Sequence, residues 1–230
     1  LEANNILPEH MERKKAVPDS HREVKVLLSL IDAMTGEMDD ALANAEEGIQ
    51  IGKEMKSRFV EAVGYTRRGH AEMIAYPYEI EKAETSYLKA IELMEQVDVS
   101  RGKAEPFMGL VLVKARKGLY DKAVNYGNYG LRETEKVNDG WLSGLIHISL
   151  GIVYYYRQSY EMSEKHLLSA IELLLECGDI YHEMIARFWL MNIYFARNEE
   201  EKLIEAAKKF SNICIEENYA FYVLTDTLFG

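Results

Sequence analysis

Metal-ligating residue types come closest together near residue 180, where Cys177, Asp179, His182 and Glu183 occur within seven positions. Their spacing could place two ligands one helical turn apart, but a closed site needs four, and no second pair with matching spacing occurs elsewhere. We therefore expect no metal site. Asp179 is interpreted as a helix cap and His182 as an ordinary residue of a helix surface.

Motifs for nucleophilic catalysis or phosphate binding are absent from the sequence. It has no Gly-x-Ser-x-Gly turn, no phosphate-cradling glycine-rich loop and no catalytic Cys/His signature. Gly127 and Gly130 have the phase of a helix packing face, and Cys177 and Cys214 are expected to be small buried or half-buried apolar groups. We therefore expect no catalytic residues and no cofactor.

A polar cluster of Arg67, Arg68, His70 and Glu72 lies on one stretch of helical periodicity. A bound anion or carboxylate ligand would account for it. We favour instead an internal ion pair with Glu61 or Glu72, or a polar exit from a groove.

The elements that carry these residues recur along the chain. Short turns have their middle residues at positions 36, 78, 118, 158 and 198, separated by 42, 40, 40 and 40 residues. After four of the five turns comes a bulky residue, a small residue three positions later and a second small one seven positions further, which lie on one helical face. Four copies follow this pattern: Met38, Ala41 and Gly48; Ile80, Ala83 and Ala90; Tyr120, Ala123 and Gly130; Tyr160, Ser163 and Ala170. The fifth has Glu200, Leu203 and Phe210, as in a degenerate terminal unit.

Each copy predicts helix A, a tight turn and helix B, and such a hairpin must stack on its neighbours to bury its apolar face. We predict one elongated all-α domain, a right-handed α-solenoid of about five hairpins with a period of about 40 residues. Loop and cap residues are expected at 98–102, 138–140 and 178–179, with Pro106 in the first turn of a helix. The expected repeats are 22–58, 59–99, 100–139, 140–179 and 180–214, between an N-terminal segment 1–21 and the truncated start of a further helix at 215–230.

Composition narrows the class of protein further. Among 230 residues, 38 acidic side chains outnumber 27 basic ones, which argues against a basic face that grips nucleic acid. No apolar run approaches the roughly 18–20 residues of a membrane span, and two cysteines favour a reducing, cytoplasmic setting. We interpret the acidic surplus as a solvated outer face, with a basic partner as the alternative.

The apolar residues 219–229 lack a polar cap, so we expect a piece of a longer protein, a native C-terminus being the alternative.

The fourth copy resembles the tetratricopeptide (TPR) pattern. The matching residues are Leu150, Gly151, Tyr154, Tyr160, Ser163, Leu167 and Ala170, and in the second copy Ala71, Ile80, Ala83, Tyr87 and Ala90. The period near 40 rather than about 34 indicates longer helices; HEAT-type repeats share that length but not this ladder of small residues. Long-period TPR arrays resemble the regulatory regions of bacterial signal-transduction ATPases and of MalT-like and LuxR-type transcriptional activators. Leu7-Pro8-Glu9 and residues 101–110 look like recurring phrases of that group.

The TPR resemblance implies that the A helices line an inner groove, which would bind a protein, a peptide or a small-molecule effector. The alternative is that these positions pack between repeats or against another domain. A carboxylate clamp is not expected, because only Arg68 and Asn192 have suitable chemistry. The implied binding positions are Tyr65, Arg68, Glu72, Tyr76, Arg116, Tyr155, Tyr156, Phe188, Asn192 and Phe195, beside Glu105, Met108, Leu112, Leu145, Ile148 and Ile152.

We therefore interpret the chain as a non-enzymatic regulatory region of a cytoplasmic bacterial transcriptional activator or signal-transduction protein. Its partners would also include other domains of the parent chain, with no direct nucleic-acid contact, no membrane and a possible homodimer. One alternative is a constitutive protein–protein adaptor without a switching role. Another is an enzyme domain completed by a partner, for which we find no residues.

Overall fold

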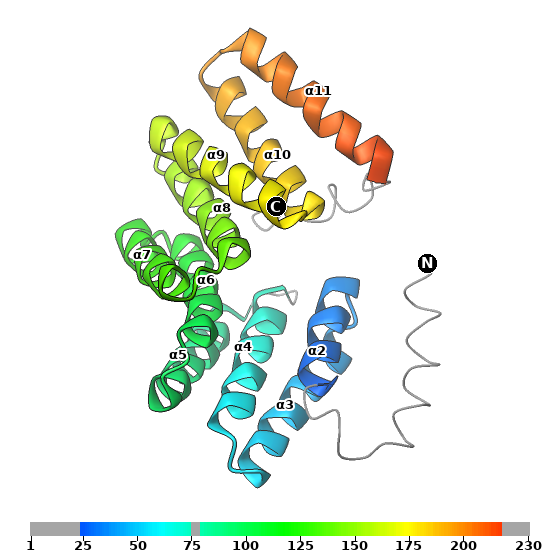
Figure 1. The fold of residues 1–230 in the computed structure, drawn as a ribbon, viewed down its shortest axis with the longest axis vertical. Coiled ribbons are helices and arrows are strands. Elements are labelled where there is room, and N and C mark those ends of the chain that lie inside the picture. The colour runs from blue at the N-terminus through cyan, green and yellow to red at the C-terminus, as the bar shows by residue number, and fades with distance from the viewer. Residues whose placement is uncertain (1–23, 75–78, 218–230) are drawn as a thin grey trace.

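The computed structural model describes residues 24–74 and 79–217, and every regular element in these ranges is an α-helix (Figure 1). The expected all-α class is confirmed. Residues 1–21, Tyr76 and the residues after 217 lie outside the described part of the chain. Five helical hairpins follow one another: α2 (Val24–Thr35) with α3 (Met38–Glu54), α4 (Arg58–Ile74) with α5 (Ile80–Val97), α6 (Ser100–Arg116) with α7 (Tyr120–Val137), α8 (Gly140–Tyr156) with α9 (Tyr160–Cys177), and α10 (Ile180–Ala196) with α11 (Glu200–Glu217).

Hairpins one to five are numbered in chain order, and the first and second helix of each are its A and B helix. Each A helix packs on its own B helix, and each B helix up to α9 also packs on the A helix of the next hairpin. Consecutive A helices also contact each other, whereas consecutive B helices of the described chain make at most marginal contacts. The A helices therefore form the inner layer of a curved stack, with α2 and α11 near its two ends (Figure 1). The fold is an α-solenoid.

Left-handed residues end the helices and keep the connections short. Gly36, Gly118 and Gly178 have positive φ, as do Asp98, Asn138, Gln158 and Asn198 at other helix ends. The backbone N–H that follows such a residue reaches back to the last helical turn, as in the 2.9 Å bond from Ser159 N to the Tyr154 carbonyl. This geometry satisfies carbonyl groups that a helix end leaves without partners.

N-terminal caps are confirmed at α8 and α10 and corrected at α6. Asp139 and Asp179 accept hydrogen bonds from the backbone N–H groups three residues later. α6, however, already begins at Ser100, because Asp98 in the left-handed region completes the break. Pro106 is therefore the seventh residue of α6 and not part of its first turn, so that α6 lacks one backbone hydrogen bond to the Gly102 carbonyl.

The ladder of small residues forms the contact faces of the B helices. Ala41, Ala83, Ala123 and Ala170 have no exposed surface, and Gly48 and Gly130 are buried. A Cβ atom on Gly127 would overlap the Leu150 side chain of α8, which confirms the packing face expected there. In α11 only Ala206 is buried, while Leu203 and Phe210 are half-buried, as expected for a terminal unit.

Ion pairs join successive hairpins along the edge where A and B helices meet in a turn. A basic residue directly after each A helix from α6 on contacts an acidic residue in the B helix of the preceding hairpin. The three basic residues lie 40 positions apart, so the period itself sets this register. The pairs are Lys117 with Glu84 at 2.6 Å, Arg157 with Asp121 at 2.9 Å and Arg197 with Glu164 at 2.7 Å.

Close approach of α3 to α4 requires glycine at position 52. A Cβ atom there would overlap the backbone of Glu61, which no rotamer change can move away. We expect Gly52→Ala to lower the free energy of unfolding by about 1–3 kcal/mol in urea denaturation. Gly140→Ala is the matched control, because its Cβ would make ordinary contacts at 3.7 Å with Cys177 Sγ and Leu173. Equal stability of the two variants would contradict this packing.

Candidate partner-binding surface

Three aromatic side chains bridge the A helices of hairpins four and five. Tyr155 and Tyr156 end α8, and Trp189 lies on α10. The Trp189 ring lies 5.3 Å from that of Tyr155 and 6.0 Å from that of Tyr156, and the two tyrosine rings are 5.7 Å apart. Edge-to-face contacts of this kind hold large rings in fixed orientations. We call Tyr155, Tyr156 and Trp189 the aromatic cluster.

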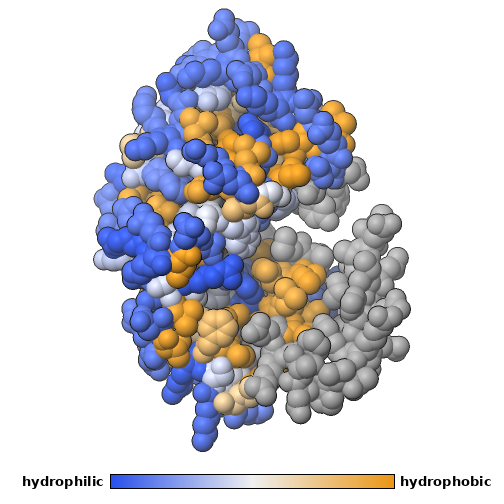
Figure 2. All heavy atoms as spheres, in the orientation of Figure 1, coloured by the Kyte–Doolittle hydropathy of each residue, from blue (hydrophilic) through white to orange (hydrophobic). Residues whose placement is uncertain are grey.

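The aromatic residues predicted to bind a partner at the C-terminal ends of α8 and α10 differ in how exposed they are. Tyr155 is half-buried and packs on the core and on Tyr160. Tyr156 is 38% exposed and Phe195, at the end of α10, is 73% exposed. Tyr156 and Phe195 are thus the aromatic side chains of this set that are available to a partner. Figure 2 shows apolar side chains gathered over the region of α9–α11, with a second patch near α2 and α4.

Arg116 of α6 lies close enough to the aromatic cluster for its positive charge to act on Tyr156. Its guanidinium donates a 3.2 Å hydrogen bond to the Met73 carbonyl of α4. Burial raises the pKa of Tyr156, the neighbouring Tyr155 and Tyr120 raise it further, and the positive charge of Arg116 acts in the opposite direction. Tyr156 therefore stays a neutral hydrogen-bond donor near a cation.

Phe188 and Asn192 make contacts within the fifth hairpin. The Phe188 ring packs between Trp189 at 5.9 Å and Phe210 of α11 at 6.0 Å. The Asn192 side-chain amide donates to the Phe188 carbonyl at 2.8 Å, one turn back along α10. Leu145, Ile148 and Ile152, which were expected to face a groove, are buried in the core that α8 shares with α9 and α10.

Arg68 and Glu72 take part in an internal network with Ser86 of α5. Arg68 donates to Ser86 at 3.1 Å and to Glu46 at 3.1 Å, and its guanidinium lies 4.8 Å from the centre of the Tyr65 ring. Ser86 donates a 2.7 Å bond to Glu72, which is only 5% exposed. Burial raises the pKa of Glu72, while Ser86 and Arg68 act to lower it. The expected Arg68–Glu72 ion pair is present at 3.7 Å.

Arg67 and His70 have a partner that sequence spacing did not identify. Both contact the carboxylate of Glu105 on the next A helix, His70 Nε2 at 3.0 Å, and His70 Nδ1 lies 2.8 Å from the Tyr87 hydroxyl. Burial alone would raise the pKa of Glu105, but Arg67 and His70 lower it to about 2. The 38-residue separation of Arg67 and Glu105, close to the repeat period, was the available signal. The cluster is thus an internal junction of hairpins two and three.

The residues near position 180 form a cap. Asp179 accepts from His182 Nδ1 at 2.7 Å and from Trp141, and these bonds outweigh its burial and lower its pKa to about 2. Glu183 pairs with Arg187. Within the described ranges, no three His, Cys, Asp or Glu side chains are grouped to hold a metal ion. Cys177 is exposed, contrary to expectation, because it ends α9 beyond the contact face, whereas Cys214 is half-buried as expected.

No known family profile and no curated protein matches the chain. Solved structures of helical-repeat proteins do. One is BtubC from P. vanneervenii, with 14% identity over 94% of this chain and 90% of that one and a TM-score of 0.67. Another is a signal transduction ATPase with numerous domains from Pyrococcus horikoshii, described with a tetratricopeptide repeat sensor, with 16% identity and a TM-score of 0.69. That match covers 94% of this chain but only 34% of the ATPase.

A third similar structure is a putative kinesin light chain from Podosopora anserina with TPR-like repeats, with 11% identity over 87% of this chain and 99% of that one and a TM-score of 0.62. At these identities the likeness concerns the fold. The chain therefore has a TPR-like α-solenoid fold, as its repeat pattern predicts. None of the described helices is both long and apolar enough to cross a membrane.

The Glu105 junction predicts a pH dependence of stability. Because the pKa of Glu105 lies at about 2 instead of 4.5, its stabilisation is complete above about pH 4.5 and is lost as the pH falls towards 2. We expect Glu105→Gln to cost about 1–2 kcal/mol at neutral pH, since its carboxylate is 30% exposed, and to cost less at about pH 3. Urea denaturation at both pH values measures this.

Glu95→Gln, which changes an exposed residue of α5, is the control for general charge effects. A Glu105→Gln effect that does not shrink in acid would refute the junction.

Proposed function

We propose that this chain is a scaffold that binds a protein or peptide through the exposed aromatic residues at the ends of its inner helices. The observation that carries this proposal is the aromatic cluster with its exposed member Tyr156, together with the exposed Phe195 at the end of the next A helix, α10. Tyrosine and phenylalanine offer large contact areas and lose little rotamer freedom on binding. The rings of Tyr155 and Trp189 both contact the Tyr156 ring, so that its orientation is fixed before a partner binds.

Arg116 adds a polar component to the proposed surface. Its positive charge near the Tyr156 hydroxyl suits a partner with a carboxylate or backbone carbonyl beside an apolar side chain. In this proposal Phe188 and Asn192 position α10 against α11. Tyr65, Arg68 and Glu72 hold α4 against α3 and α5, and their contribution to binding is indirect.

We further propose that the scaffold is the regulatory region of a cytoplasmic bacterial transcriptional activator or signal-transduction protein. The long-period TPR resemblance supports this, as does the fold shared with an ATPase described with a TPR sensor. A bound protein, peptide or small effector would favour one curvature of the stack and so reach other domains of the parent chain. The size of that shift is limited by the difference in affinity for the two curvatures. Direct nucleic-acid or membrane contact has no role in this proposal, and a homodimer is compatible with it.

The binding proposal is tested with a peptide library displayed on phage and selected on the whole chain. We expect Tyr156→Ala and Phe195→Ala each to weaken binding of the selected peptides by about 10-fold, because truncated aromatic anchors cost about 1–2 kcal/mol. Leu175→Ala is the matched control, since Leu175 is also apolar and 55% exposed but belongs to a B helix. Loss of binding in Leu175→Ala alone, or equal binding by all variants, would reject the proposed surface.

The regulatory proposal differs from a constitutive adaptor in what binding does to the stack. Consecutive A helices pack directly on each other, so a peptide bound at their ends would change the angle between hairpins and with it the curvature of the stack. We therefore expect an excess of a selected peptide to change the radius of gyration of the chain in small-angle X-ray scattering. The control is the same peptide with Phe195→Ala. Binding without any change in the scattering curve would favour the adaptor.

A further inference from the structure

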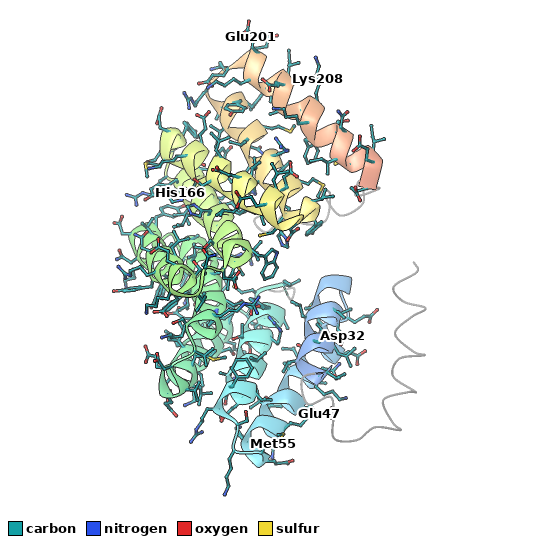
Figure 3. All side chains as sticks on the ribbon, viewed as in Figure 1. Asp32, Glu47, Met55, His166, Glu201 and Lys208 are labelled. Carbon is teal, nitrogen blue, oxygen red and sulfur yellow. The ribbon has the colours of Figure 1, made fainter. Side chains whose placement is uncertain are left out.

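Hairpin four contains two histidines in direct contact. His147 Nδ1 on α8 lies 2.9 Å from His166 Nδ1 on α9, and their ring centroids are 5.0 Å apart. The His166 ring also stacks on Tyr154 at 5.3 Å with an interplanar angle of 12°. Both histidines are half-buried, and Figure 3 shows His166 on the side of the hairpin away from α2. A hydrogen bond between two Nδ1 atoms requires that one ring accepts, so at least one imidazole must be neutral.

The third hairpin provides an internal comparison. Phe107 and Tyr126 occupy the positions 40 residues before His147 and His166, and their rings lie 6.1 Å apart between α6 and α7. The same place between an A and a B helix is thus filled by a phenyl and a phenol ring and contains no imidazole. Hairpin four has a titratable pair instead.

The charged surroundings of the pair oppose its protonation. Lys165 lies next to it on α9, and burial together with Lys165 lowers the pKa of His147. Burial, His147 and Lys165 lower the pKa of His166 to about 4. No carboxylate of the described residues bonds to either ring. On the adjoining elements, Arg157 lies over the Tyr154 ring and pairs with Asp121 of α7, and Arg187 of α10 pairs with Glu183.

We propose that the His147–His166 contact is a pH-sensitive joint, which weakens the packing of α8 on α9 as the pH falls below neutral. Two protonated imidazoles are both donors and repel each other, so the contact at 2.9 Å cannot persist. His166 takes up its proton from about pH 6.5 in the unfolded chain but only near pH 4 in the folded chain, and the pKa of His147 is also lowered by folding, so stability falls as the pH drops below 6.5. This inference does not depend on the proposed binding function.

The test copies the pair of hairpin three into hairpin four. In the whole chain, His147→Phe with His166→Tyr keeps aromatic rings at both positions and removes their titration. We expect the unfolding equilibrium constant of the wild type to rise roughly 10-fold more than that of the double variant between about pH 7 and pH 5, measured by urea denaturation. An equal rise in both proteins would overturn the proposal.

A second measurement needs no variant. In a nuclear magnetic resonance titration of the wild-type imidazoles, we expect His147 and His166 to take up protons with midpoints below the ordinary 6.5 and, because they interact, in coupled steps. Midpoints of 6.5 for both residues would refute the joint. Stabilisation of the wild type by Zn²⁺ that the double variant lacks would also overturn it and assign the pair to metal binding.

Discussion

The structure depends on one constraint: each hairpin covers its apolar face only by packing on the next. Tyr87 shows how this is done. It projects from α5 into the space between α4 and α6, where Gly69 and Gly109 leave room for its ring. A Cβ atom at either glycine would overlap that ring. The Tyr87 hydroxyl then meets His70, which holds Glu105 of the next hairpin. One side chain thus joins the apolar and the polar contacts between hairpins two and three.

The other hairpins have the same backbone arrangement but different side chains at the position equivalent to Tyr87. The place of Tyr87 is taken by Gly127 in α7 and by Leu167 in α9, and both pack on α8. Regular turns, with one left-handed residue at each described connection, keep the frame constant. The side chains between the layers are therefore free to vary, as the change from Phe107 to His147 shows. The same freedom allows aromatic residues to gather at the ends of α8 and α10 without altering the stack.

Sequence periodicity predicted the hairpins because small residues and turns report contacts within and next to a B helix. Ala83, Ala123 and Ser163 were placed on a buried face, and each is fully buried. The same reasoning placed helix caps at Asp139 and Asp179. A face of one helix is defined by spacing alone, so this part of the structure follows from a single sequence.

Contacts between hairpins were harder to predict, since they depend on how far consecutive A helices approach each other. Glu105 was assigned to an open groove, but α4 lies close enough for Arg67 and His70 to bind its carboxylate. Ile148 and Ile152 were assigned to the same groove and are buried by the neighbouring helices. In each case the residue lies on the predicted helix. Which side chains it contacts depends on how closely the neighbouring helix approaches, and that distance is set by the curvature of the stack.

The central claim, that stacking and not the individual hairpin stabilises the helices, is tested most directly by circular dichroism of residues 140–178 as a separate peptide. This segment contains α8 and α9 and its core residues Leu150, Leu167 and Leu174. Our account predicts mostly unfolded peptide without a cooperative thermal transition, because the faces that meet α6, α7 and α10 would be exposed. A monomeric peptide with full helix content and cooperative melting would contradict it.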